Sequence, residues 1–222
     1  MPPTPENSAA AKTLQQLQAL GVRDAFGYLG SLKDILDKIM VTSAPGNSPA
    51  VNLTLNDGIK YLNTDFLESA LLTDQRLIVV GNGASAAIAI HTLADFANAG
   101  GLKTIDLFSP ALLTCMANDY GYENVFAKPI EILANGDILF AVSSSGQSPN
   151  IIKACQAALA KKCQVFTFSG FSQDNPLRKL GRLNFYVPST HYGFVEITHQ
   201  IILHCILDLF IRNNVNEEGM DL

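Results

Sequence analysis

The sequence has few charged residues and no excess of basic ones. Charged side chains make up 16% of the 222 residues, and the formal net charge is -5. Nucleic-acid binding through a cationic face needs clustered Lys and Arg, so this charge balance argues against such a partner. Apolar residues make up 48%. That share is ample for a core, and we expect part of the apolar surface to be buried between subunits.

The sequence also lacks the marks of a secreted or membrane protein. Its four cysteines form no Cys-x-x-Cys pair and lie in apolar stretches, which indicates free, buried thiols in a reducing compartment. The N-terminal segment has neither the basic region nor the apolar stretch of a signal peptide, and no apolar run is long enough to span a bilayer. We therefore expect a cytoplasmic protein without a membrane partner.

The first 75 residues come before any expected strand of the main domain. Residues 1–8 are expected to form a disordered tail, and residues 9–75 to form N-terminal helices that pack on the domain or on a partner subunit. Apolar residues recur at helical spacing from 9 to 40, with breaks expected at Gly21 and Gly27, and again from 56 to 72. Residues 41–52, which include Pro45, Gly46 and Pro49, are expected to form a loop.

From residue 76 onward, short apolar runs alternate with helical stretches. This alternation implies right-handed crossovers and a three-layer, doubly wound, five-stranded parallel sheet for a domain spanning 76–222. In such sheets ligands bind beyond the carboxyl ends of the strands, at the switch point. The expected strands are Leu77–Val80, Thr104–Phe108, Ile138–Val142, Val165–Phe168 and Asn184–Val187. The expected helices cover residues 85–98, 123–133, 148–161, 176–180 and 194–212.

Two loops after the first and third of these strands are candidates for an anion site. In Gly81-Asn82-Gly83-Ala84-Ser85 the glycines permit a tight turn and close approach of a ligand, and Ser85 falls near a helix N-terminus. The second loop, Ser143-Ser144-Ser145-Gly146-Gln147-Ser148, offers hydroxyls and helix amides to a phosphate. It lacks the Gly-Lys-Ser/Thr ending of an ATP-binding loop. The alternative is that Ser148 only caps a helix that begins at Pro149.

Two expected helices carry possible metal ligands. His91 and Asp95 are four residues apart and share one helix face, and Glu196 and His204 lie eight apart on the last helix, with His199 and Gln200 between them. A lone buried His is more often a core residue than a ligand, so each histidine alone is weak evidence. Together the two imidazoles and two carboxylates suit a divalent ion such as Zn, without excluding Fe, Mn or Ni.

Three motifs in order resemble a known family. These are Gly81 to Ser85, Ala117-Asn118-Asp119-Tyr120-Gly121-Tyr122 and the serine loop from Ser143 to Ser148. They resemble the SIS (sugar isomerase) domain, and within it the phosphoheptose isomerases, which act on sedoheptulose 7-phosphate. The resemblance covers residues 9–210 and implies the SIS fold and homotetramers with active sites between subunits. It also implies substrate contacts from Asn82, Gly83, Ala84, Ser85, Asn118, Asp119, Ser143, Ser144, Ser145, Ser148 and Glu196.

The same resemblance implies a zinc site at His91, Asp95, Glu196 and His204. It assigns the general base of the isomerisation to Asp95 and the complementary acid to His204. Asp95 stands where the family has Glu, and Glu196 where it has Gln. Because Asp has a shorter side chain than Glu, the carboxylate of the base lies closer to its own helix. A misplacement of ~1 Å can cost on the order of a hundredfold in rate. The added carboxylate strengthens the case for a bound cation.

Further departures from the family bear on which sugar is bound. Ala84 replaces a usual Gly, Ile88 a usual Asp, and the segment from Thr190 to Phe194 lacks the family's Asp and Arg. The expected function is isomerisation of a phosphorylated sugar, sedoheptulose 7-phosphate first among the candidates. The alternative is a non-catalytic SIS protein that binds a sugar phosphate or a protein such as a replication initiator, and a third is a metal-dependent enzyme with altered chemistry on a related phosphosugar.

Overall fold

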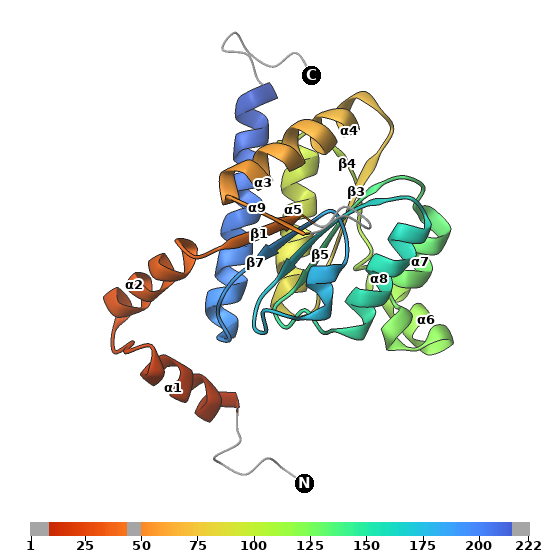
Figure 1. Cartoon of the computed structure of the whole chain (residues 1–222). Coiled ribbons are helices and arrows are strands. Elements are labelled where there is room, and N and C mark those ends of the chain that lie inside the picture. Colours follow the sequence, from red (N-terminus) through yellow and green to blue (C-terminus); the bar gives the residue numbers. More distant parts are fainter. Residues whose placement is uncertain (1–8, 44–49, 215–222) are drawn as a thin grey trace.

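A mixed seven-stranded sheet forms the centre of the molecule, in a computed structural model that describes residues 9–43 and 50–214 (Figure 1). The strand order is β2-β1-β7-β6-β5-β3-β4. The expected tail at 1–8 lies outside the described residues. The strands are β1 (Met40–Ser43), β2 (Val51–Leu53), β3 (Arg76–Val80), β4 (Lys103–Ile105), β5 (Ile138–Ser143), β6 (Gln164–Ser169) and β7 (Leu183–Tyr186).

The five strands from β3 to β7 are parallel, as the alternation predicts. The expectation of only five strands is wrong, because β1 and β2 extend the sheet as an antiparallel pair, with β1 also antiparallel to β7. Both lie largely within residues 41–52, the stretch expected to be a loop. Val41 is fully buried opposite Phe185, so burial against β7 makes a strand of a segment too short to show a periodic pattern.

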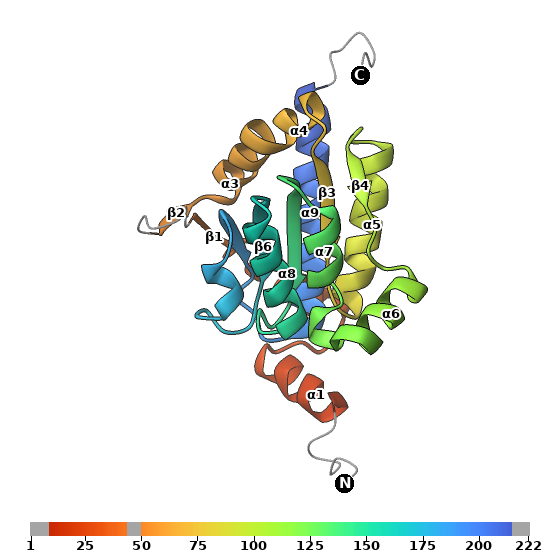
Figure 2. The ribbon, with the colours of Figure 1, turned by 90° about the vertical axis from the view of Figure 1, so that its right-hand side faces the viewer.

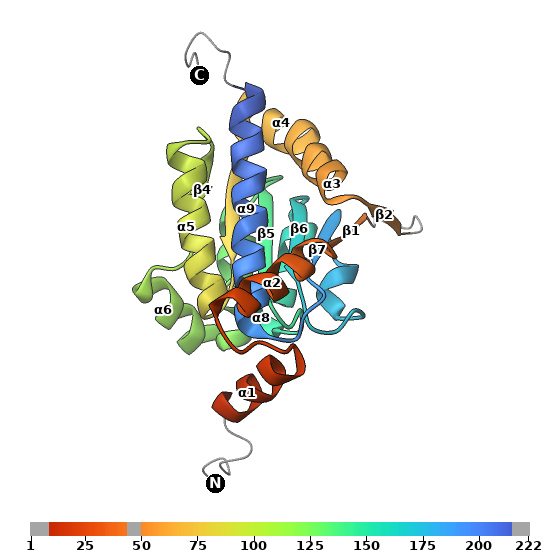
Figure 3. The ribbon, with the colours of Figure 1, turned by 90° about the vertical axis from the view of Figure 1, so that its left-hand side faces the viewer.

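Helices cover both faces of the sheet and make it the middle of three layers (Figures 2 and 3). One face carries α3 (Leu55–Leu62), α4 (Glu68–Leu72), α5 (Ala84–Asn98) and α9 (Tyr192–Asn214). The other carries α6 (Pro110–Tyr120), α7 (Ala127–Leu133) and α8 (Pro149–Ala160). Side chains in β3 alternate between the two layers: Leu77 and Val79 join the α5–α9 core, whereas Ile78 joins the α8 core.

The N-terminal helices α1 (Ala9–Ala19) and α2 (Ala25–Leu36) extend from the domain, and α2 crosses α9 (Figure 3). Tyr28 of α2 stacks on Phe194 of α9, with ring centroids 4.4 Å apart. The break expected at Gly21 is confirmed. The one expected at Gly27 is wrong, because the Asp24 side chain accepts the Gly27 N–H and caps the helix there.

Three helical features differ from the expectations drawn from the sequence. The helix expected at 56–72 contains a π-helical turn, Asn63–Leu67, where the buried Asn63 amide donates to the Ile206 carbonyl at 3.0 Å. Helix α6 has no fully buried residue, so the apolar pattern does not mark it clearly. The helix expected over 123–133 is shorter, because a 3-10 turn, Tyr122–Asn124, precedes α7.

Helix α9 is apolar because it lies in the core. By length and composition it could cross a membrane, contrary to the expectation that no run is long enough. Half of its most apolar window is buried inside the protein. Phe194, Ile202, Ile206 and Phe210 are all buried in the core layer shared with α5 and the sheet. Packing therefore accounts for the apolar character of the helix.

The four cysteines are free thiols in different surroundings. Cys155 and Cys163 are buried, Cys205 is partly buried and Cys115 is exposed. The expectation of buried thiols is therefore wrong for Cys115, which lies on the exposed helix α6. Burial raises the pKa of Cys155 to about 12, so this thiol is unreactive near neutral pH.

Candidate active site

The site forms where the sheet changes winding direction. Strands β3 and β5 are adjacent and parallel, and the helices that follow them, α5 and α8, cover opposite faces. Their carboxyl ends therefore lie side by side, and the glycine turn after Val80 meets the serine loop after Ser143. The expected meeting of these two loops is confirmed.

The glycine turn places Ser85 at the start of α5. A Cβ on Gly81 would lie 2.4 Å from the Ser85 carbonyl oxygen, so only glycine permits this close approach. Gly83 has φ +56° and precedes the first helical residue. The Ser85 side chain is consequently buried in the first turn of α5, beside free backbone N–H groups.

The serine loop is a tight turn that is fixed by backbone hydrogen bonds and by packing against Asn175. The Gly146 N–H donates to the Ser143 carbonyl at 3.0 Å, and Gly146 has φ +63°. A Cβ on Gly146 would lie 2.1 Å from Oδ1 of Asn175, a buried side chain that donates to the Gly170 and Ser172 carbonyls. The Leu177 N–H also donates to the Gly146 carbonyl at 3.1 Å. The turn is therefore packed against the loop that follows β6.

Two hydroxyls of this loop are not used to build the fold. Ser148 occupies the N-cap position of α8, but its side chain makes no capping hydrogen bond and only accepts a long one, 3.4 Å, from Ser143. The buried Ser144 hydroxyl has no hydrogen-bond partner within the described part of the chain. These hydroxyls favour the ligand-binding interpretation over the simple N-cap, because buried polar groups normally have partners.

A small cavity of about 130 Å³ lies between the two loops. It opens beside the N-termini of α5 and α8, whose free N–H groups and dipoles favour an anion. Its described lining contains no Lys or Arg, so binding would rest on neutral donors. Burial raises the pKa of Glu196, the one carboxylic acid among the wall residues in ranges 9–43 and 50–214. The lining residues are Asn82, Ser85, Ser143, Ser144, Ser145, Ser148, Tyr192 and Glu196.

A second group of residues lies on the outer face of α5 and α9. His91 Nε2 is 3.1 Å from Asp95 Oδ2, and His204 Nδ1 is 3.9 Å from the same oxygen. The three possible ligand atoms lie within 4.8 Å of one another. Two imidazoles and a carboxylate at this spacing fit a zinc ion with a fourth position open. The side chains of His91 and His204 are 52% and 43% exposed, so this face is accessible from outside.

Glu196 does not join that group within one chain. It lies eight residues before His204 on α9, which is about 12 Å along a helix axis. Its side chain lines the serine cavity instead. Of the four predicted ligands, one chain therefore brings together His91, Asp95 and His204 but not Glu196.

Other expected substrate contacts lie outside the cavity wall. Asn118 and Asp119 are exposed near the end of α6, where the Asn118 amide donates to the Asp119 carboxylate at 2.9 Å. Gly83 and Ala84 are exposed at the start of α5, next to the cavity but not among its lining residues. In contrast, Tyr192 lines the cavity and was not expected. It precedes the predicted helix start, so periodicity gave no signal for it.

Residues 48–170 match the model of the SIS domain family. This match covers more than half of the chain. The chain belongs to the SIS domain family. Its serine cavity and glycine turn thus belong to an SIS domain, as the sequence motifs predict.

Relatives with similar sequences include phosphoheptose isomerases, which are enzymes. The phosphoheptose isomerase of Helicobacter hepaticus is 34% identical over 162 residues, which cover 70% of this chain and 82% of the relative. That of Aromatoleum aromaticum is 33% identical over 153 residues, covering 65% and 77%. The structure of phosphoheptose isomerase from Neisseria gonorrhoeae superposes with a TM-score of 0.70 at 25% identity, covering 89% of this chain and 98% of that one.

Proposed function

We propose that the protein is an aldose–ketose isomerase of a phosphorylated sugar, acting on sedoheptulose 7-phosphate to give D-glycero-D-manno-heptose 7-phosphate. The observation that carries the proposal is the pairing of a neutral, donor-lined anion cavity with an Asp–His group that contains a base and an acid. The phosphoheptose isomerases similar to this chain support the choice of sugar. The proposed setting is the cytoplasm.

Each active site combines residues from two copies of the chain in this proposal. One copy supplies the serine cavity and Glu196, and a second supplies His91, Asp95 and His204. Three observations support sharing: the separation of Glu196 from His204, the exposure of the His–Asp group, and the exposed apolar residues Ile90 (45%), next to His91, and Ile197 (40%), next to Glu196. A homotetramer fits this arrangement. Exposed apolar side chains of α1, α2 and the turn between them supply further surface for it: Leu14, Leu20, Phe26 and Leu29.

The donor set fits a zinc ion held by His91, Asp95 and His204, with Glu196 of a second copy as the fourth ligand. When bound, the ion would supply positive charge that stabilises the oxyanion developing on the sugar. It would also compensate for the burial of the Glu196 carboxyl, which raises the pKa of that group.

The residues divide the reaction between binding and proton transfer. The hydroxyls of Ser143, Ser145 and Ser148 donate to the phosphate, and the amides at the helix N-termini add further donors. The Asp95 carboxylate removes a proton from C1 of the open-chain ketose, giving an enediol shared between C1 and C2. A proton is then returned to C2 while O1 becomes the aldehyde oxygen. His204, 3.9 Å from Asp95, supplies and accepts the protons at the two oxygens.

The test is turnover of sedoheptulose 7-phosphate by the purified, tag-free protein, with zinc content measured on the same sample. The expected result is formation of the aldose, loss of turnover on chelation and recovery on adding zinc. Asp95→Asn should abolish turnover while phosphate binding remains. No aldose from the zinc-loaded protein would contradict the isomerase and leave a phosphosugar-binding protein.

A further inference from the structure

A directed chain of hydrogen bonds ends at the serine cavity. Asn82, which lines the cavity, and Asn150, in the first turn of α8, exchange two hydrogen bonds: the Asn82 amide donates to Asn150 Oδ1 at 2.9 Å, and the Asn150 amide donates to Asn82 Oδ1 at 2.8 Å. The Tyr122 hydroxyl donates to Asn82 Oδ1 at 3.2 Å. Asn150 is only 2% exposed, so this pair is built into the fold.

The backbone fixes the direction of this chain. The Ile151 N–H donates to Asn150 Oδ1 at 3.1 Å and shares this proton with the Ser148 carbonyl. A backbone N–H only donates, so the Asn150 atom that faces it must be oxygen. The Asn150 nitrogen then faces Asn82 Oδ1, and the orientation of the Asn82 amide follows.

Asn82 is therefore left with donors only on its cavity side. Its Oδ1 accepts from Asn150 and from Tyr122, which uses both lone pairs. One of its two N–H groups donates to Asn150, so one N–H stays available at the cavity wall. An amide fixed in this way favours an acceptor such as a phosphate oxygen over a donor.

We propose that Tyr122 and Asn150 are positioning residues that hold Asn82 as a donor toward the anionic group of the phosphosugar. The inference rests on the proposed function of the cavity and adds two residues that do not line it. Tyr122 lies in the 3-10 turn after α6, Asn82 in the turn after β3, and Asn150 in α8. The network therefore joins three segments that follow different strands and secures the cavity wall between them.

The experiment is a double-mutant cycle of Tyr122→Phe and Asn82→Ala. Two readouts are measured: the Kd of inorganic phosphate by calorimetry, and KM and kcat for sedoheptulose 7-phosphate. In the unmodified background, Tyr122→Phe should weaken phosphate binding and raise KM about three- to tenfold, with kcat changed less than about twofold. In the Asn82→Ala background it should have no further effect, because its target is gone.

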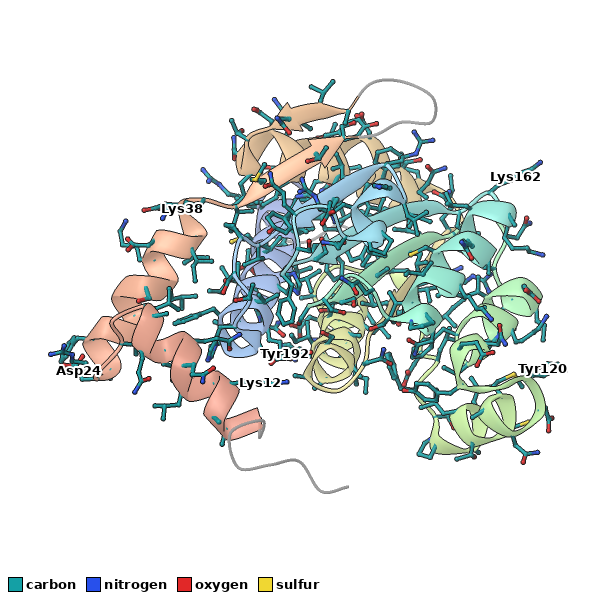
Figure 4. All side chains as sticks on the ribbon, turned by 60° about the horizontal axis from the view of Figure 1, so that its bottom comes forward. Lys12, Asp24, Lys38, Tyr120, Lys162 and Tyr192 are labelled. Carbon is teal, nitrogen blue, oxygen red and sulfur yellow. The ribbon has the colours of Figure 1, made fainter. Side chains whose placement is uncertain are left out.

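Tyr120→Phe is the matched control. Tyr120 is 48% exposed at the end of α6, well away from Tyr192 at the cavity (Figure 4), and its ring contacts Lys128 rather than a lining residue. This variant should leave both readouts unchanged. Effects of Tyr122→Phe that are equal in the two backgrounds, or no phosphate binding by the unmodified protein, would overturn the inference. If the two substitutions are coupled in phosphate binding but the unmodified protein does not turn over the phosphosugar, only the isomerase proposal is overturned. If the protein turns over the phosphosugar but the substitutions are not coupled, only the proposed network is overturned.

Discussion

Glu196 and His204 lie on the same helix, α9, but face two separate groups of residues. The Glu196 carboxyl lines the serine cavity, whereas the His204 imidazole lies 3.9 Å from Asp95 on the outer face shared with α5. The eight residues between them correspond to about 12 Å of helix. A single chain thus keeps the two groups apart, and the proposed function requires that they meet across an interface between copies.

The three-residue group should determine metal binding. His91→Ala removes a ligand that lies 3.1 Å from Asp95, and we expect zinc affinity to fall by more than about tenfold. Asp208→Asn is the control, because Asp208 is exposed one turn beyond His204 and is not part of the group. Zinc titration with a competing chelator measures the difference. Equal affinities of the two variants would contradict the assignment.

The serine hydroxyls should determine substrate binding. Ser148→Ala removes a hydroxyl that no helix cap uses, and we expect KM for the phosphosugar to rise about tenfold or more, since hydrogen bonds to charged groups are worth about 1.5–3 kcal/mol. Ser172→Ala, in an exposed turn where Ser172 bonds to Asp174, is the control and should leave KM unchanged. Steady-state kinetics on both variants checks this. An unchanged KM for Ser148→Ala would place the phosphate elsewhere.

Gly146 should be more sensitive to substitution than another glycine of similar backbone conformation. Gly146→Ala combines a positive φ with a contact 2.1 Å from the buried Asn175, whereas Gly136 has φ +76° and open space around it. Gly136→Ala should cost about 1–2 kcal/mol of unfolding free energy from the backbone alone. Gly146→Ala should cost more and also weaken phosphate binding. Denaturant unfolding and phosphate titration compare the two, and equal losses would show that the contact with Asn175 is unimportant.

Glu196 should lower the stability of the metal-free protein as pH rises. Burial raises the pKa of Glu196, so the folded state favours the protonated form. The contribution of this protonated carboxyl to the free energy of unfolding is complete below the pKa that Glu has in the unfolded state, about 4.3. It is lost as the pH rises through the pKa of Glu196 in the folded state. We therefore expect Glu196→Gln to become more stable relative to the unmodified protein as pH increases from about 4. Unfolding at several pH values in chelator measures the difference, and a constant one would contradict the prediction.

The sequence predicted the parallel part of the fold because its strands are buried on both faces. Runs such as Leu77–Val80 and Ile138–Val142 are continuously apolar, and the helices between them have clear periodicity. It failed for β1 and β2, which have four and three residues and exist through pairing with β7. It also missed α6, whose residues are never fully buried. Short or exposed elements carry too little pattern to be predicted locally.

For the site, spacing along one helix predicted which side chains meet within a chain over one turn, but not over two. The i, i+4 pair of His91 and Asp95 does meet, with the expected His204 beside it. The i, i+8 relation of Glu196 to His204 does not let both side chains of one chain reach the same ion, because of the distance along the helix axis. The partners of Asn82 could not be predicted at all, because Tyr122 and Asn150 approach it only through the packing of three loops.

The most direct test of the shared site mixes two inactive variants. Asp95→Asn keeps the serine cavity and loses the base, whereas Glu196→Ala keeps the base and loses the carboxyl in the cavity. When the two are co-expressed and purified as mixed oligomers, random assembly should restore complete sites in about one quarter of positions, and sedoheptulose 7-phosphate turnover with them. Each variant alone should be inactive. Mixed oligomers as inactive as the separate variants, beside an active unmodified protein, would show that each chain carries its own complete site.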